Sequence, residues 1–466
     1  MRLIALLALS AISALAQTTV IDGVNARADH FGKLSRQIWE NPETGFEEFK
    51  SAALLRDELK AAGFRITENV GGMPTAFIAE YGSGAPVIAL LGEYDALPGL
   101  SQDDVPEKKP RVEGAPGHGC GHNTFGVASA LAAVAVKEQM VKRGLKGTVR
   151  FYGTPAEEGG GGKIYMIRAG AFKDVDVALA WHPWDRNEVD SNSWLANISA
   201  KVRYTGKAAH AAAAPEAGRS ALDAVEIMTH AVNMLREHVP QETRMHYIIS
   251  NGGSAANVVP ANAELSIIVR HPDSKTLESI WERVLNCARA GAIATDTKME
   301  FEIAASYANL VPVPSVVSLL DKNLKLVGGV HYTDDERKFA EAIRANVDTF
   351  NAPPLGTEAK ILPPRTALAY ASTDVGDVSQ VVPTGQLLAA TFPPGTPLHT
   401  WLSTACAGTS LARKGMLVSA KTLALSTMDL LANPSLVADA KAGWQEMMKG
   451  RQYRSLLPPD RKPTPR

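Results

Sequence analysis

The segment "GHGCGHNTFG", which runs from Gly117 to Gly126, places one thiol and two imidazoles among four glycines. Cysteine and histidine side chains bind zinc and other borderline transition ions, whereas calcium and magnesium prefer oxygen ligands. The glycines permit turns that aim Cys120 and His122 in one direction, and a thiolate just before a helix is stabilised by the helix dipole. These residue types favour a metal site, the alternative being that Cys120 is an inert buried thiol.

Acidic and imidazole side chains also follow three strand-like runs elsewhere in the chain. They are Glu93 and Asp95 after "VIALLG", Glu157 and Glu158 after "TVRFYG", and His182 after "VDVALAW". In open α/β sheets, ligands bind outside the carboxyl ends of the strands, so separate segments deliver side chains into one crevice. The convergence of thiol, imidazole and carboxylate groups predicts a site for zinc or a similar ion, although a lone His182 would more often be a packed core residue.

The stretch "PAEEGGGG" has more than one interpretation. Two adjacent carboxylates beside a metal can divide the work, one as ligand and the other as general base on a metal-bound water. Alternatively, the acidic pair only stabilises the N-terminus of a helix ahead of a glycine loop. A nucleotide-binding loop is excluded, because Glu157 stands where that pattern needs glycine and Ile164 where it needs serine or threonine.

The elements that must position these residues follow from the alternation of sequence patterns. From about residue 20 to residue 62 the pattern is helical, and β-branched runs then alternate with helical ones. This alternation is typical of a layered α/β sheet with mostly parallel strands. Near Trp194 the pattern changes to one strand, one helix, two strands, one helix and a last strand, which predicts a compact α+β unit.

These patterns predict a small domain inserted into a larger one. The predicted divisions are a signal peptide at 1–16, a discontinuous catalytic domain at 18–196 and 309–450, an inserted domain at 197–308, and a disordered Pro-rich basic tail at 451–466. The signal peptide is indicated by Arg2, the apolar run "LIALLALSAISALA" and the small residues before Gln17. It predicts a periplasmic or secreted protein, whereas the alternative is a buried first helix.

Composition limits the classes of partner. The chain has 466 residues, of which 45% are apolar and 21% charged, and its formal net charge is -1. This balance gives no electrostatic reason to expect nucleic acid or an anionic membrane, so a small molecule or another protein is favoured. Only three cysteines are present, Cys120, Cys287 and Cys406, which excludes a disulfide scaffold.

Six motifs in a fixed order extend this interpretation. They are "GEYDALPGL", "GHGCGHNTFGVASA", "GTPAEEGGGGK", "GKAAHAAAAPEAGRSALDA", "NVVPANAELSIIVR" and "PLHTW". Together they resemble the aminoacylase and glutamate-carboxypeptidase metallohydrolases, specifically the amidohydrolase branch, from about Val20 to Asn433. The resemblance implies an α/β fold with a phosphorylase/hydrolase-like mixed sheet flanked by helices. It also implies an inserted ferredoxin-like α+β domain that serves in dimerisation or as a lid.

The implied activity is that of a metal-dependent amidohydrolase or metallopeptidase. Its substrate would be a small-molecule amide, either an N-acyl or N-aroyl amino acid, for example one like aminobenzoyl-glutamate, or a dipeptide. The implied cofactors are two divalent metal ions, zinc or manganese, with cobalt as an alternative. The implied assembly is a homodimer or a heteromer with a related subunit.

The resemblance also assigns roles to individual residues. The positions that match the family's metal ligands are Cys120, His122, Glu158, His182 and His399. Glu157 matches the general base, and Asp95 matches a carboxylate that orients a ligand, a role that physical reasoning also allows. In the inserted domain, His210 matches a residue that polarises the scissile carbonyl in the site of the partner subunit, while Asn257 and Arg270 match positions that hold the substrate carboxylate.

Two positions depart from the family pattern. Glu93 stands where many two-zinc relatives carry a histidine ligand, so a bridging Cys120 would have to compensate. Asn123 replaces an aspartate of the auxin-conjugate hydrolases, which argues against their substrates.

Two other classes of function remain open on the sequence. One is a cysteine hydrolase that uses Cys120 with His118 or His122. The other is a non-catalytic or obligate partner subunit of a heteromeric amidohydrolase. A serine hydrolase with a nucleophile elbow is not supported, because the Gly-x-Ser-x-Gly pattern is missing from the sequence.

Overall fold

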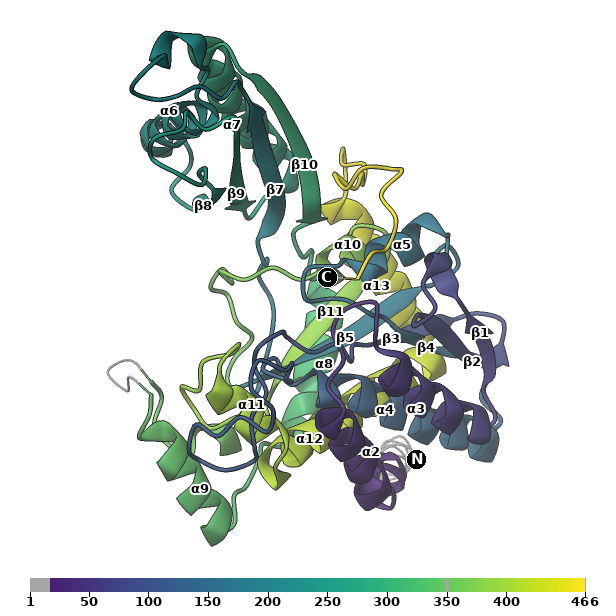
Figure 1. The fold of residues 1–466 in the computed structure, drawn as a ribbon. Coiled ribbons are helices and arrows are strands. Elements are labelled where there is room, and N and C mark those ends of the chain that lie inside the picture. Colours follow the sequence, from purple (N-terminus) through teal and green to yellow (C-terminus); the bar gives the residue numbers. More distant parts are fainter. Residues whose placement is uncertain (1–16, 348–351, 466) are drawn as a thin grey trace, which may run out of the picture.

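The computed structural model describes residues 17–347 and 352–465. The predicted signal peptide at 1–16 lies outside the described residues. Two bodies are visible in Figure 1: a larger one built on a seven-stranded sheet, and a smaller one that stands apart from it on strands β7 (Ala196–Thr205) and β10 (Lys298–Tyr307).

The larger sheet is mixed, with its parallel strands at the centre. Its strand order is β1-β2-β4-β3-β5-β11-β6. The bounds are β1 Arg65–Glu68, β2 Phe77–Ser83, β3 Val87–Gly92, β4 Gly147–Gly153, β5 Val177–Trp184, β6 Glu188–Val189 and β11 Thr384–Ala390. β4, β3, β5 and β11 run parallel, whereas β1, β2 and β6 pair antiparallel. The central strands are continuous apolar runs because both of their faces are covered.

Helices pack on both faces of this sheet and enclose two separate cores. Along β3, Ile88 and Leu90 belong to one core, and Ala89 and Leu91 belong to the other, as the two-residue period of a strand requires. The first core holds α2 (Ala28–Glu40), α3 (Phe49–Ala61), α4 (His122–Arg143), α8 (Pro314–Val327), α12 (Ser410–Ala432) and α13 (Pro434–Met447). The second core holds α5 (Gly162–Arg168) and α10 (Val375–Ser379). The layered α/β fold with a mixed sheet is confirmed.

One helix in the described part of the chain, α12, is long and apolar enough to cross a membrane by those two measures alone. Within the structure, 78% of its most apolar window is buried. It packs against α4 and β11 in the first core, so its apolar character is that of a core helix.

The smaller body contains the predicted strand, helix, two strands, helix and strand. Its elements are β7, α6 (Ala221–Leu235), β8 (Arg244–Asn251), β9 (Asn262–His271), α7 (Ser274–Thr295) and β10, and its sheet order is β10-β7-β9-β8. All three strand pairings are antiparallel. Both helices pack on the sheet around a core of its own, so this inserted domain folds around its own apolar interior.

The tail at 451–465 differs from the expected disorder. Leu457 is only 2% exposed, and the Tyr453 hydroxyl donates to Asp377 at 2.8 Å. The Arg168 guanidinium of α5 donates to the carbonyl oxygens of Leu457 and Pro458. Composition predicted disorder because the segment is rich in proline and basic residues, but one tyrosine and one leucine supply anchors.

Candidate metal centre

The loop that carries Cys120 and His122 runs directly into α4. Gly121, between them, has a φ of 77° and ends the loop as the residue before the helix. A side chain at this position would also come within 2.9 Å of Phe392 and Pro183. Glycine therefore lets the backbone turn here, and the turn places Cys120 and His122 at the carboxyl ends of the parallel strands.

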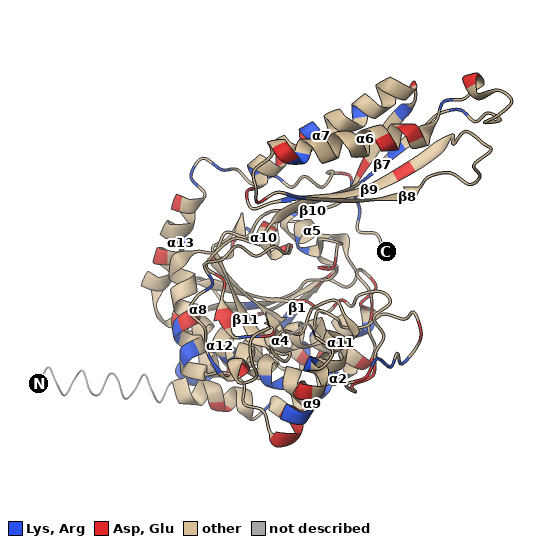
Figure 2. Cartoon of the chain, turned by 90° about the vertical axis from the view of Figure 1, so that its left-hand side faces the viewer, with Lys and Arg blue, Asp and Glu red and all other residues tan. Residues whose placement is uncertain are grey.

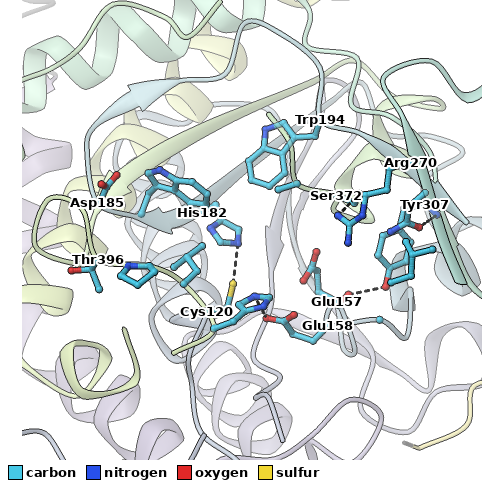
Figure 3. Close-up of a pocket in the computed structure, with 18 of the residues that line it drawn as sticks. Cys120, Glu157, Glu158, His182, Asp185, Trp194, Arg270, Tyr307, Ser372 and Thr396 are labelled. Carbon is cyan, nitrogen blue, oxygen red and sulfur yellow. Dashed lines mark hydrogen bonds and ion pairs between the residues drawn. The ribbon is translucent and has the colours of Figure 1, made fainter. Parts of the chain in front are cut away.

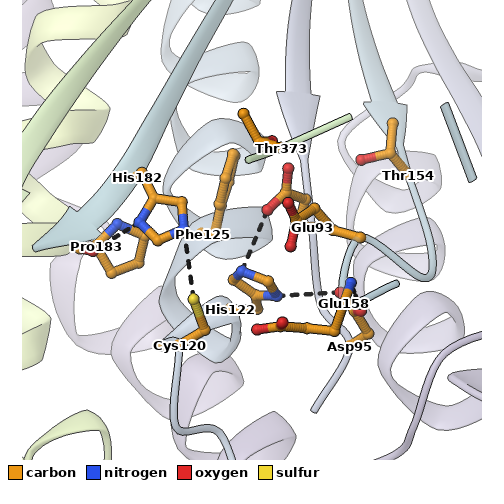
Figure 4. Close-up of polar contacts among 12 residues, drawn as sticks. Glu93, Asp95, Cys120, His122, Phe125, Thr154, Glu158, His182, Pro183 and Thr373 are labelled. Carbon is orange, nitrogen blue, oxygen red and sulfur yellow. Dashed lines mark hydrogen bonds and ion pairs between the residues drawn. The ribbon is translucent and has the colours of Figure 1, made fainter. Parts of the chain in front are cut away.

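Two histidines each have one ring nitrogen engaged by the protein (Figure 4). His122 Nδ1 lies 3.0 Å from Asp95 Oδ1, and His182 Nδ1 lies 2.7 Å from the Pro183 carbonyl oxygen. Metal-binding histidines characteristically donate their second N–H to a carboxylate or carbonyl in this way. This leaves the Nε2 atoms to face the site, where His182 Nε2 lies 3.4 Å from Cys120 Sγ.

Burial shapes the protonation of these groups. It lowers the pKa of His182 to about 3, with help from the neighbouring His122, so the imidazole is neutral at physiological pH. It raises the pKa of the Cys120 thiol well above its ordinary value, and the Glu158 carboxylate adds to this effect. A neutral imidazole is the form that ligates a metal, and a thiolate at such a position requires a bound cation.

His399, from the loop before α11 (Trp401–Ala407), reaches the same place from the C-terminal half of the chain. Its backbone N–H donates to the Gly119 carbonyl at 2.9 Å, and its Nε2 lies 3.3 Å from Glu158 Oε1. The Glu158 N–H donates to Asp95 Oδ2 at 2.8 Å. Reasoning from residue types alone missed His399, because a histidine in a Pro-rich loop carries no local signal.

The described residues form three groups of donor atoms, of which two share Cys120 and the third is Glu93, His122 and Glu157. Within each group all atoms lie within 4.8 Å of one another. Of the two that share Cys120, one is Cys120, His122 and His182, and the other is Cys120, Glu158 and His399. His122 Nε2 and Glu158 Oε1 are buried and have no hydrogen-bond partner among the described residues. Cys120 is thus common to both groups, and these five side chains are of the types that would hold two divalent ions.

Glu93 belongs to a buried charge network behind this centre. Its Oε1 lies 2.7 Å from Lys163 Nζ, which lies 2.6 Å from Asp374 Oδ1, and all three side chains are fully buried. Burial raises the pKa of the Glu93 carboxyl to about 7, against the opposing effect of the Lys163 charge. Glu93 Oε2 lies 3.3 Å from His122 Nε2. Sequence reasoning found neither Lys163 nor Asp374, and nothing in the sequence around Asp374 signals this contact.

A pocket of about 680 Å³ opens onto the metal donors. Cys120, Glu157 and His182 line one part of it, and Arg270 lines another (Figure 3). Trp184, Trp194 and Tyr307 supply its aromatic wall. The pocket therefore combines residues of the large sheet with residues of the inserted domain.

Arg270 comes from β9 of the inserted domain. Its Nη1 donates to Ser372 Oγ at 3.2 Å, whereas its Nε is buried and has no hydrogen-bond partner among the described residues. Burial lowers the pKa of this guanidinium. A desolvated cation with an unused donor is suited to a ligand carboxylate.

His210 and Asn257 lie together on the inserted domain, and both are exposed. The Ala211 N–H donates to the Asn257 carbonyl at 3.0 Å. His210 Nδ1 accepts from the N–H groups of Ala212 and Ala213 at 3.3 and 3.1 Å, which caps a turn and leaves Nε2 as the nitrogen that carries the proton and can donate. Neither residue is among those that line the pocket within the described chain.

Comparison with known proteins places the chain in a family. Residues 196–296 match the model of the M20 peptidase dimerisation domain. The chain is 41% identical to the B subunit of p-aminobenzoyl-glutamate hydrolase from Escherichia coli K12, over 95% of this chain and 98% of that protein. It is 33% identical to the mouse Xaa-Arg dipeptidase, over 89% of this chain and 88% of that protein.

Solved structures show the same fold at lower sequence identity. A dinuclear metal-binding peptidase of the M20 family from Bacillus subtilis is 18% identical with a TM-score of 0.61, over 88% of this chain and 99% of that one. The aminobenzoyl-glutamate utilization protein of Klebsiella pneumoniae is 18% identical with a TM-score of 0.57, over 84% and 96%. The identity to the Escherichia coli hydrolase over nearly both full lengths shows that this chain belongs to the M20 metallohydrolases, the aminoacylase and glutamate-carboxypeptidase family, and is a metal-dependent amidohydrolase.

Proposed function

We propose that the chain hydrolyses the amide bond of N-acyl or N-aroyl amino acids and that the amino-acid carboxylate lies against Arg270. The observation that carries this proposal is the pocket itself, where two donor groups sharing Cys120 face one cavity with Glu157 and an unsatisfied guanidinium. The names of the relatives, p-aminobenzoyl-glutamate hydrolase and Xaa-Arg dipeptidase, support amides with a free carboxylate as the first substrates to test.

The metal ions would be held by Cys120 with His122 and His182, and by Cys120 with Glu158 and His399. When bound, two divalent ions, zinc or manganese, polarise the scissile carbonyl and lower the pKa of water towards neutrality. Asp95 contacts both His122 and Glu158, so it fixes one residue of each donor group.

Glu157 is the residue that would move the proton. It lines the pocket, and its pKa is raised well above the ordinary value by burial and by the nearby carboxylates of Glu93 and Glu158. A carboxylate with a raised pKa can accept a proton from the attacking water and return it to the leaving nitrogen. Glu157 is therefore the proposed general base.

The assembly we propose is a homodimer formed through the inserted domain, in which His210 and Asn257 enter the partner's pocket. Strand β8 lies at the edge of its sheet, and Ile248 and Ile249 on it are 66% and 45% exposed. An apolar edge strand of this kind is a template for pairing with another chain. The exposure of His210 in this chain is consistent with a role at a second site.

The test uses the purified single chain, stripped by chelation and reconstituted with zinc, manganese or cobalt. Its substrates are p-aminobenzoyl-glutamate, N-benzoyl amino acids and dipeptides with a C-terminal arginine. We expect hydrolysis that disappears with chelator and returns with metal, and analytical ultracentrifugation should give a dimer.

The outcomes of this test separate the alternatives. Activity that survives chelation and is lost on thiol alkylation would indicate a cysteine hydrolase at Cys120. A single chain that stays inactive with metal, and gains activity only with a related protein, would indicate an obligate partner in a heteromer.

Export is a separate proposal that rests on the composition of residues 2–16. N-terminal sequencing of the protein from a periplasmic fraction should begin at Gln17. A cytoplasmic protein that retains Met1 or Arg2 would refute it.

A further inference from the structure

The backbone around Glu157 holds an unfavourable conformation. Ala156, the residue before Glu157, has a φ of 57°, which is the left-handed region that residues with a side chain seldom occupy. Such a conformation persists only where surrounding contacts over-determine it. The contacts that fix the backbone at this point come from distant parts of the chain.

Three consecutive residues are each held by a side chain from a different part of the molecule. The Ala156 N–H donates to Glu48 Oε1 at 2.8 Å, and the Glu158 N–H donates to Asp95 Oδ2 at 2.8 Å. Between them, the Glu157 carbonyl accepts from the Tyr307 hydroxyl at 2.9 Å. The three anchors come from the start of α3, the residues after β3, and the end of β10.

The side chains of Glu48 and Tyr307 are both buried where they make these contacts. Glu48 is 0% exposed, and its second oxygen accepts from Thr75 Oγ1 at 2.9 Å. Tyr307 is 6% exposed and is the last residue of the inserted domain's sheet. The ring of Tyr307 also lines the pocket (Figure 3), so one side chain connects the inserted domain, the pocket and the loop that carries Glu157.

We propose that Glu48 and Tyr307 are positioning residues that clamp the strained backbone around Glu157 and so aim its carboxylate into the pocket. This rests on the proposed role of Glu157 as general base. Catalytic groups tolerate little displacement, and a misplacement of about 1 Å can lower the rate about 100-fold. The clamp also ties the aim of Glu157 to the position of the inserted domain.

Tyr307→Phe tests the clamp, because it removes one hydroxyl and leaves the ring. Tyr204→Phe is the matched control, since its hydroxyl is also buried and donates to a carbonyl, that of Ala288 at 2.9 Å, but inside the inserted domain. With p-aminobenzoyl-glutamate as substrate, we expect kcat of Tyr307→Phe to fall about 10- to 100-fold. KM should stay within about threefold of wild type and bound metal should be unchanged, because the variant misaligns Glu157 in the transition state without weakening substrate binding.

Two further measurements test the clamp: one does not depend on turnover, and the other uses variants of Glu48. Amide hydrogen exchange of the peptide 154–163 should rise in Tyr307→Phe and not in Tyr204→Phe. Glu48→Gln, which keeps an acceptor oxygen, should retain most of kcat, whereas Glu48→Leu should lose it as Tyr307→Phe does.

The proposal is overturned if Tyr307→Phe behaves like Tyr204→Phe in both kcat and exchange, or if it raises KM alone. A Glu48→Gln chain as impaired as Glu48→Leu would also overturn the acceptor role. If instead Glu157 is not the general base, Glu157→Gln would keep wild-type turnover. The hydrogen exchange of peptide 154–163 would still show whether Tyr307 holds this backbone.

Discussion

The crevice of the large sheet and the surface of the inserted domain differ in the burial of their polar side chains and in the partners of those side chains. In the crevice, Glu93, His122 and Lys163 are fully buried, and their contacts are with other charged or ligand-type side chains. On the inserted domain, His210 and Asn257 are exposed and their contacts are with neighbouring backbone. Figure 2 shows basic and acidic residues mixed along the exposed helices of both bodies.

The difference shows which polar groups have their partners within this chain. A buried polar group is stable only when it has a partner inside the molecule, so the crevice must carry its own. An exposed histidine is satisfied by water and needs no partner until another surface covers it. The metal-donor residues of the crevice therefore come from one chain, whereas the proposed roles of His210 and Asn257 require a second chain.

The largest effect is expected in the crevice at Glu157. Glu157→Gln removes the group proposed to move the proton but keeps its size, so turnover should fall by up to about 10⁴-fold. Bound metal, measured by elemental analysis, should stay near the wild-type content. Loss of metal together with activity would make Glu157 a ligand and would change the division of roles between Glu157 and Glu158.

The next effect is on stability, at the buried Lys163. Lys163→Met leaves Glu93 and Asp374 without their shared cation, and breaking a buried ion pair in this way costs about 3–5 kcal/mol. Urea denaturation of the metal-free protein should show a correspondingly lower free energy of unfolding. A loss below about 1 kcal/mol would mean that the network is solvated or protonated rather than a buried triad of charges.

On the inserted domain, His210 should affect turnover and not folding. If it donates to the oxyanion in a partner's pocket, His210→Ala should cost about 100- to 1,000-fold in turnover. Chains carrying His210→Ala and Glu157→Gln should each be nearly inactive but recover part of the activity after exchange of protomers, since a mixed dimer holds one intact site. If mass spectrometry confirms exchange and the mixture stays inactive, the action across the dimer is wrong.

The smallest effect is expected at an exposed ion pair of the inserted domain. Arg203, 43% exposed, contacts Glu264 at 2.7 Å and Glu302 at 3.1 Å. Surface pairs contribute about 0.2–1 kcal/mol and are screened by salt, so Arg203→Gln should change urea stability by less than about 1 kcal/mol. If Arg203→Gln lowered the free energy of unfolding as much as Lys163→Met, the proposed difference between the buried crevice and the exposed inserted domain would be wrong.

Much of the site could be predicted from the sequence, because residues that follow parallel strands meet at the same edge of the sheet. The positions of Cys120, His122, Glu158 and His182 after separate strands pointed to one crevice, and the structure brings these residues together. His182 differs in detail, since β5 extends to Trp184 and includes it. His399 entered only through family resemblance, because its contact with the Cys120 loop joins segments far apart in the sequence and leaves no local pattern.

Tertiary structure also corrected the tail and added residues that no pattern revealed. The contact of Tyr453 with Asp377 depends on where α10 and the chain end meet. Lys163 lies in a short run that the sequence pattern predicted to be helical, and its place between two carboxylates follows from how α5 packs against the loop before α10. Contacts of this kind are set by packing between distant segments, for which a single sequence has no period or motif.

The sequence by itself determined the layered α/β architecture, the inserted α+β unit and the types of ligand, because hydrophobic period and residue chemistry are local properties. Only the tertiary structure decided that Cys120 belongs to two donor groups, that Glu48 and Tyr307 hold the backbone at Glu157, and that His210 lies outside its own pocket. Each of these depends on distances between segments far apart in the chain. Those distances are fixed by the close packing of two cores and by the strands that join the inserted domain to the large sheet.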